Sequence, residues 1–192
     1  MSILSRDKWE KLTHKKNLSG AEALEAVNKD GYDLQYVKDQ TPEICLAAVN
    51  DNGFALKYVK DQTPEICLSA VNDYSDAIKF VKYQTPEICL AAVRQDGETL
   101  KYVRNQAPKI CLAAVSEDGD ALEYVIDQTP EICLAAVKQN GYALQYVKEQ
   151  TPEICLAAVN ECGDALQYVE ERFLDDEIIV VNGKKYRLME EV

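Results

Sequence analysis

The residues most able to do chemistry in this chain are its seven cysteines. Six recur every 22 residues, and no CxxC pair or Cys/His cluster with zinc-ligand spacing accompanies them. Packed helices lie ~8–10 Å apart, beyond the ~7 Å within which two Cα atoms can be bridged by a disulfide. We therefore interpret the six as small buried thiols that pack as Ala or Val would, and we predict no metal and no cofactor. They are Cys45, Cys67, Cys89, Cys111, Cys133 and Cys155.

Other catalytic patterns are sparse. His14 is the single histidine and lies far in sequence from every repeated cysteine, so no Cys–His pair is predicted. No glycine-rich phosphate loop occurs, and the carboxylates form regular rows. Cys162 replaces the Asp or Asn that precedes a helix-opening glycine, which predicts an exposed free thiol. We expect a protein that is not an enzyme.

The cysteine spacing is one column of an internal repeat. A typical copy is QTPEICLAAVNDNGFALKYVKD at 40–61, and all six prolines occupy its third place. A more divergent copy at 18–39 retains the second half of the repeat but lacks the Thr-Pro pair. The predicted organisation is an N-terminal capping segment (1–17), a repeat array (18–171) and a C-terminal segment (172–192). The seven repeats are 18–39, 40–61, 62–83, 84–105, 106–127, 128–149 and 150–171.

Each repeat carries the start and stop signals of two short helices. Thr41 suits an N-cap, and Pro42 suits the first helical position, where its missing N–H costs nothing. Asn52-Gly53 ends the first helix and begins the second. The first apolar face comprises Ile44, Cys45, Ala48 and Val49, with Leu46 beside it; the second comprises Ala55, Leu56, Tyr58 and Val59.

Helices of about ten residues are marginal alone, so each repeat must bury its faces against the next. The predicted fold is all-α, an α-solenoid of seven two-helix 22-residue repeats. The aromatic column that includes Tyr58 and Tyr102 is interpreted as core between repeats.

The two ends are predicted to cap the stack. In 1–17, Trp9 and Leu12 lie at i, i+3 on a short capping helix. In 172–192, two apolar runs flank Asn182-Gly183, the signature of a type I′ β-hairpin. That small hairpin is expected to place Ile179 and Val181 on the last repeat.

Composition excludes several classes of protein. The 192 residues carry 33 acids and 21 bases, a net charge of −12. No apolar stretch approaches the ~18–20 residues that cross a bilayer, and the first residues reach charge too early for a signal peptide. An odd number of cysteines indicates a reducing compartment. We expect a cytoplasmic protein without a membrane partner.

One candidate interface is a basic strip beside aromatic residues. Three successive repeats carry a pair of cations on the second helix, and repeat 62–83 departs from the repeat pattern at Tyr74 and Tyr83. Exposed tyrosines beside lysines are typical of protein interfaces. The alternative is that these cations offset the dipole at a helix C-terminus. The members are Lys57, Lys60, Tyr74, Lys79, Lys82, Tyr83, Arg94, Lys101 and Arg104.

A second candidate interface is acidic and falls mainly in repeats 106–127 and 150–171. Its field would orient a partner with a basic surface. The alternative is a solvated surface that favours solubility. The members are Glu117, Asp118, Asp120, Glu123, Glu161, Asp164, Glu170 and Glu171.

The TPEICLAAV…GxALxYV repeat, quoted from 40–61 and its copies, resembles a family of tandem 22-residue helical repeats of unknown function found in bacteria, phages and large DNA viruses. The resemblance covers 18–171 and is weaker in repeat 18–39 and at Ser75, Ala107 and Lys109. It implies no catalytic residues, and it favours a mobile-element protein that binds a host factor.

These observations favour a non-enzymatic protein-binding repeat module. The most specific hypothesis is an acidic phage or mobile-element inhibitor that blocks a nucleic-acid-handling host defence protein, as anti-CRISPR proteins do. Two alternatives stay open. One is nucleic-acid binding through the basic strip, which the net charge of −12 opposes. The other is a structural or assembly scaffold.

Overall fold

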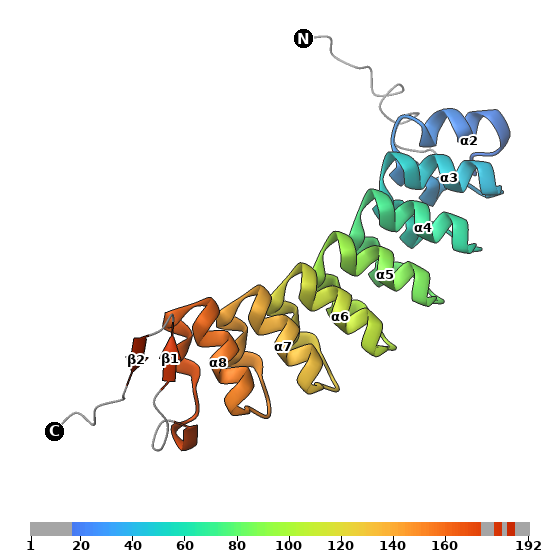
Figure 1. The fold of residues 1–192 in the computed structure, drawn as a ribbon. Helices are drawn as coiled ribbons and strands as arrows, with labels where there is room; N and C mark the ends of the chain where they lie inside the picture. Colours follow the sequence, from blue (N-terminus) through green and yellow to red (C-terminus); the bar gives the residue numbers. More distant parts are fainter. Residues whose placement is uncertain (1–16, 174–178, 182–183, 187–192) are drawn as a thin grey trace, which may run out of the picture. The chain divides into compact units, whose positions relative to one another are not determined.

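The computed structural model describes residues 17–173, 179–181 and 184–186 (Figure 1). The chain divides into two compact halves, Met1–Ile88 and Cys89–Val192. Helix α5 (Pro86–Gln95) contains the boundary, and each half is described by itself.

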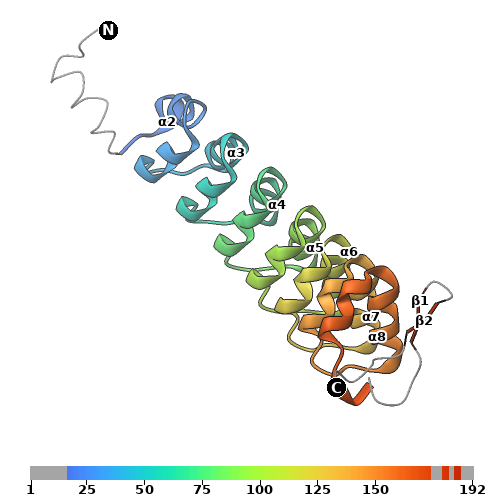
Figure 2. The same ribbon diagram turned by 90° about the vertical axis from the view of Figure 1, so that its left-hand side faces the viewer.

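The first half alternates α-helices with 3-10 helices. The α-helices pack on one another in one layer and the 3-10 helices pack on one another in a second layer (Figures 1 and 2). In chain order the elements are α2 (Gly20–Val27), η1 (Gly31–Tyr36), α3 (Pro42–Asp51), η2 (Gly53–Tyr58), α4 (Pro64–Asp73) and η3 (Ser75–Phe80).

The second half repeats this arrangement, with α6 against α7, α7 against α8, and the 3-10 helices side by side. Its helices are η4 (Gly97–Tyr102), α6 (Pro108–Glu117), η5 (Gly119–Tyr124), α7 (Pro130–Gln139), η6 (Gly141–Tyr146), α8 (Pro152–Glu161), η7 (Gly163–Tyr168) and η8 (Glu171–Phe173). The prediction of helical repeats packed in succession is confirmed within each half.

The first helix of a repeat forms for the reasons that its sequence indicates. Pro42 is the first residue of α3, and the Thr41 hydroxyl oxygen accepts a hydrogen bond from the N–H of Ile44 at 3.3 Å. The same cap opens α4, α7 and α8, whereas Ala107 leaves α6 without a side-chain cap. The predicted apolar face is buried in α3: Ile44, Cys45, Ala48 and Val49.

The second helix of each repeat is a six-residue 3-10 helix, a type that the sequence did not indicate. A period of three residues places Gly53, Leu56 and Val59 on one ridge, and all three are buried. Tyr58, in contrast, is half-buried, as is the whole aromatic column. The column is thus only partly buried: its rings contact rings of neighbouring repeats, as Tyr58 contacts Tyr32 at 6.1 Å, without lying fully in the core.

The repeats are joined by a glutamine side chain. In the first half, the Gln40 amide nitrogen donates to the carbonyls of Leu34 and Tyr58 at 3.3 and 3.0 Å, and its amide oxygen accepts from the N–H of Lys60 at 2.9 Å. The Tyr58 carbonyl and the Lys60 N–H lie at and just beyond the C-terminal end of η2, past the reach of an intrahelical partner, whereas the Leu34 carbonyl also accepts the Val37 N–H at 3.1 Å. Gln40 therefore ties the 3-10 helices of two successive repeats together.

The same bridge recurs down the chain. Gln62 and, in the second half, Gln106 and Gln128 make the corresponding three bonds. In the part of the chain that the structure describes, no buried side-chain nitrogen or oxygen lacks a hydrogen-bond partner.

At Gly119, the first residue of η5, the next repeat approaches closely, although Ser75 opens η3 at the corresponding position. A Cβ on Gly119 would lie 2.6 Å from the Ala136 carbonyl oxygen and 2.8 Å from Oε1 of Gln139. That same Oε1 accepts a hydrogen bond from the Gly119 N–H at 2.6 Å. Gly163 opens η7, and a Cβ there would have no neighbour within 4 Å.

The predicted caps are only partly within the described residues. The capping helix with Trp9 and Leu12 lies outside them. Strands β1 (Ile179–Val181) and β2 (Lys184–Tyr186) pair antiparallel, with Ile179 opposite Tyr186. Residues 182–183, the predicted turn, lie outside the described residues, so the C-terminal β-hairpin cap is not confirmed. Among the residues described, no helix has the length and apolar character to span a bilayer.

Replacing Gln128 by Ala should lower the free energy of unfolding by about 2–4 kcal/mol, because the Tyr146 carbonyl and the Lys148 N–H lose their partner; the Leu122 carbonyl keeps the Val125 N–H. Gln145→Ala is the matched control, since the exposed Gln145 amide bonds only the Tyr142 carbonyl of its own helix. Urea denaturation measures both. Equal unfolding midpoints for the two variants would contradict the bridging role of Gln128.

Gly119→Ala should destabilise the fold by about 1–3 kcal/mol, because the new methyl group overlaps the Ala136 carbonyl oxygen. Gly163→Ala meets nothing and should leave stability unchanged or raise it by up to about 1 kcal/mol. Thermal denaturation followed by circular dichroism compares them. The close approach of the repeats is refuted if Gly119→Ala melts as Gly163→Ala does.

Candidate partner-binding surface

The acidic residues of the second half lie mostly on and beside its 3-10 helices. In sequence, residues 106–171 hold twelve acids and three bases, and η5, η6 and η7 contain no Lys or Arg at all. Of the three bases, Lys109 lies in the first turn of α6 and Lys138 in the last turn of α7, whereas Lys148 follows η6 and its ammonium donates to the Val125 and Ile126 carbonyls at 3.1 and 2.8 Å. Negative charge is therefore concentrated on this layer.

One acidic group surrounds η5. Asp118 caps this helix by accepting the N–H of Asp120 at 3.0 Å, and Asp120 Oδ1 accepts from the Asn140 amide at 3.0 Å. Burial raises the pKa of Asp120, and the charges of Asp118 and Glu123 raise it further. Glu123 and Glu117 are exposed. Asp118 and Asp120 are thus partly structural, whereas Glu117 and Glu123 face solvent.

A second acidic group surrounds η7. The Tyr142 hydroxyl donates to Asp164 Oδ2 at 3.3 Å, and Glu161 ends α8. A hydrogen bond to Cys162 and the electrostatic effects of Cys162 and Asp164 raise the pKa of Tyr142 to about 12. Two further acids follow η7: Glu170, which pairs with Arg172 at 2.6 Å, and the exposed Glu171.

The lysines of the predicted basic strip have partners within the protein. The Lys57 ammonium lies 4.8 and 4.7 Å from the ring centroids of Tyr32 and Tyr58. Lys79 lies over Phe54 at 4.7 Å and pairs with Asp76 at 3.6 Å.

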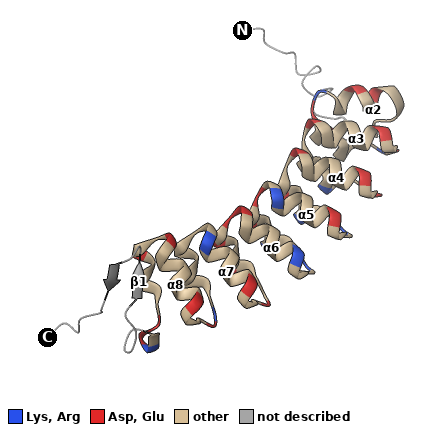
Figure 3. Ribbon diagram, viewed as in Figure 1, with Lys and Arg blue, Asp and Glu red and all other residues tan. Residues whose placement is uncertain are grey.

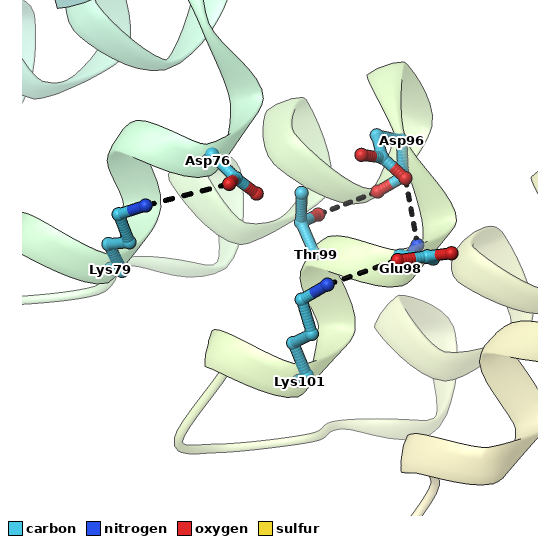
Figure 4. Close-up of polar contacts among 6 residues, drawn as sticks. All are labelled: Asp76, Lys79, Asp96, Glu98, Thr99 and Lys101. Carbon is cyan, nitrogen blue, oxygen red and sulfur yellow. Dashed lines mark hydrogen bonds and ion pairs between the residues drawn. The ribbon is translucent and has the colours of Figure 1, made fainter. Parts of the chain in front are cut away.

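In the second half, Lys101 lies 5.4 and 5.7 Å from the ring centroids of Tyr102 and Tyr124. It pairs with Glu98 at 3.0 Å, next to the hydrogen-bonded Asp96 and Thr99; Figure 4 shows this pair and the pair of Lys79 with Asp76.

The outer lysines of the strip also bond the backbone. The Lys60 and Lys82 ammonium groups donate to the carbonyls of Lys38 and Lys60 at 2.8 and 2.6 Å. Arg94 ends α5 and is exposed, as is Arg104. Tyr83 is 84% exposed, and Tyr74 is 50% exposed with its ring 4.6 Å from Phe54. The lysines therefore stabilise the 3-10 layer, in addition to the helix-dipole effect considered from sequence.

The six repeated cysteines are buried free thiols, as predicted. Each described Sγ contact runs to the repeat's glutamine; Cys155 Sγ donates to Gln150 Oε1 at 3.3 Å. Burial is the main cause that raises the pKa of all six, to about 11 for Cys155. Within the described ranges, no cluster of three or more His, Cys, Asp or Glu side chains is placed to hold a metal ion.

Sequence reasoning missed the grooves between successive α-helices. Between α7 and α8 a groove of about 400 Å³ is lined by Leu134, Leu156 and Ala157 together with four polar or charged residues, Lys138, Glu153, Asn160 and Glu161. A groove of about 790 Å³ between α2 and α3 has the same construction. The sequence feature that indicates these grooves is the Leu-Ala pair of PEICLAAV. Every full repeat except 62–83 retains the pair, although its two side chains are not fully buried.

A row of charge marks the N-terminal ends of the α-helices. Glu43 and Glu65 occupy the first turns of α3 and α4 in the first half, and Glu131 and Glu153 those of α7 and α8 in the second. Figure 3 shows these acidic positions in red and the basic substitution, Lys109, in blue on α6. Carboxylates there complement the helix dipole, so this row has a structural explanation that the exposed Glu117 and Glu161, at the C-terminal ends of their helices, lack.

Two segments of the chain, residues 23–63 and 108–150, match a family described as "Domain of unknown function (DUF4116)". The tandem match agrees with a repeat family of unknown function. No curated protein and no solved structure is significantly similar to the chain.

Native protein should show one fast-reacting thiol with Ellman's reagent and six that react only on unfolding. Reaction requires an accessible thiolate, and the six repeated cysteines are buried with raised pKa values, whereas Cys162 is half-exposed. Cys162→Ser should abolish the fast phase. Several fast thiols in the native Cys162→Ser variant would contradict the buried column.

Proposed function

We propose that the chain is a non-enzymatic protein-binding module whose second half receives a partner with a basic surface. The observation that supports this proposal is the charge of its 3-10 layer. Glu123 is exposed on η5, Glu117 and Glu161 are exposed at the C-terminal ends of α6 and α8, directly before η5 and η7, and η5, η6 and η7 supply no cation of their own. By contrast, Lys57 and Lys79 in the first half, and Lys101 of η4, lie over aromatic rings of the same layer.

Unpaired acidic surfaces speed and orient association with basic proteins, and their contribution weakens as salt rises. The family match fits a repeat module and assigns no reaction. Direct nucleic-acid binding is a weaker alternative, because the lysines that would carry it already contact rings, carboxylates and carbonyls.

A narrower form of the proposal makes the partner a nucleic-acid-handling defence protein, with the chain as a phage or mobile-element inhibitor. Its support is the acidic surface alone. Under this form, DNA or RNA and the chain should compete for the same basic groove of the partner, so excess nucleic acid should release the chain.

The test is a triple charge reversal, Glu117→Lys with Glu123→Lys and Glu161→Lys. The protein is immobilised and incubated with a lysate of the encoding organism at about 50 and about 300 mM salt. Mass spectrometry then identifies the proteins that are retained at each salt concentration. We expect a salt-sensitive basic protein to be retained by the unmodified chain and lost, by at least about tenfold, with the triple variant.

The matched control reverses Glu131, Glu149 and Glu153, which are also exposed but lie at or just before the N-terminal ends of the α-helices. Net charge changes equally in the two variants. If both lose the partner alike, binding follows net charge and the proposed surface is wrong; if neither loses it, the acidic residues take no part.

A further inference from the structure

The 3-10 layer of the first half contains an aromatic pair that binds a cation of the protein itself. The rings of Tyr32 and Tyr58, from successive repeats, lie 6.1 Å apart at an interplanar angle of 80°. The Lys57 ammonium lies within 4.8 Å of both centroids. Such a distance is that of a cation–π contact, so this pair is an internal example of the geometry that holds an alkylammonium group.

The same pair recurs in the second half without the lysine. Tyr142 of η6 and Tyr168 of η7 lie 6.3 Å apart at 78°, which reproduces the first pair closely. Gln167 occupies the position that corresponds to Lys57, directly before the second tyrosine. Its amide nitrogen donates to the Asp164 carbonyl of its own helix at 3.0 Å, so it is engaged in a local backbone bond.

A carboxylate completes the second pair. Asp164 occupies the position that corresponds to Phe54 in the first half, and its Oδ2 accepts the Tyr142 hydroxyl at 3.3 Å. Tyr142 is 37% exposed, Asp164 is exposed and Tyr168 is half-buried, so both rings and the carboxylate can be reached from solvent. The second pair therefore has two π faces, a negative charge and no lysine at the position that fills the first.

We propose that Tyr142, Tyr168 and Asp164 form a binding site for an external organic cation, the ammonium of a lysine or the guanidinium of an arginine side chain on a partner protein. The two rings would flank the cation as they flank Lys57, and Asp164 would pair with its charge. The site itself is independent of the proposed function; only the identification of its occupant as a partner's side chain rests on it.

The test uses a small probe, Nα-acetyl-lysine amide, whose side-chain ammonium is free, with Nα-acetyl-norleucine amide as the neutral analogue of similar length. Ring signals of Tyr142 and Tyr168 in NMR titrations report binding. We expect the lysine probe to bind about fivefold or more tightly than the neutral probe, the factor that two exposed cation–π contacts supply. Equal affinity for the two probes would overturn the proposal.

Gln167→Lys should fill the site with the protein's own ammonium, as in the first half, and remove the preference for the lysine probe. Gln35→Lys is the matched control, because Gln35 has the same place in η1 and the same local bond, to the Tyr32 carbonyl at 3.1 Å. It should leave the preference intact. Retained binding in Gln167→Lys would place the probe elsewhere.

The reciprocal change, Lys57→Gln, should create a second and weaker site at Tyr32 and Tyr58, where Phe54 replaces the carboxylate. New shifts of those two rings with the lysine probe alone are expected; their absence would show that the ring pair does not hold a cation. Because these probes need no protein partner, failure here leaves the pull-down result standing, and failure of the pull-down leaves this site standing.

Discussion

The structure depends on one hydrogen-bonding requirement at the junction between repeats. Where the chain leaves a 3-10 helix, one carbonyl and one N–H have no helical partner, and an orphaned buried group costs about 1–3 kcal/mol. A side chain that carries both a donor and an acceptor and is long enough to reach two repeats satisfies both groups. Gln40 and Gln128 do so with near-identical distances.

Once the junction is satisfied internally, the outer positions of the 3-10 layer are free to change in charge. Lys57 and Lys79 in the first half, and Lys101 of η4 in the second, lie on aromatic rings, whereas η5 and η7 place Glu123 and Asp164 beside tyrosines. One backbone arrangement therefore carries lysine–aromatic contacts at η2, η3 and η4 and an acidic, aromatic surface at η5 and η7. This contrast is the basis for placing a basic partner on the second half.

Much of the fold follows from local sequence, and much of the candidate surface does not. Pro42 and Thr41 mark a helix start through local sterics and capping, and the buried positions of Cys45 and Val49 follow from helical periodicity. The type of the second helix was missed because six residues carry too few turns to separate a period of three from 3.6. Lys57 was assigned to an interface because its ring partner Tyr32 lies 25 residues earlier in the sequence.

By itself, the sequence determined the 22-residue repeat, the starts of the α-helices and the buried face, since each depends on neighbouring residues or on periodicity. Tertiary structure alone decided what Gln40 bridges, how closely the next repeat approaches Gly119 and which aromatic pair has Gln167 in the place of a lysine. Those properties depend on atoms brought together from different repeats, about 20 residues apart, and no local pattern encodes such distances.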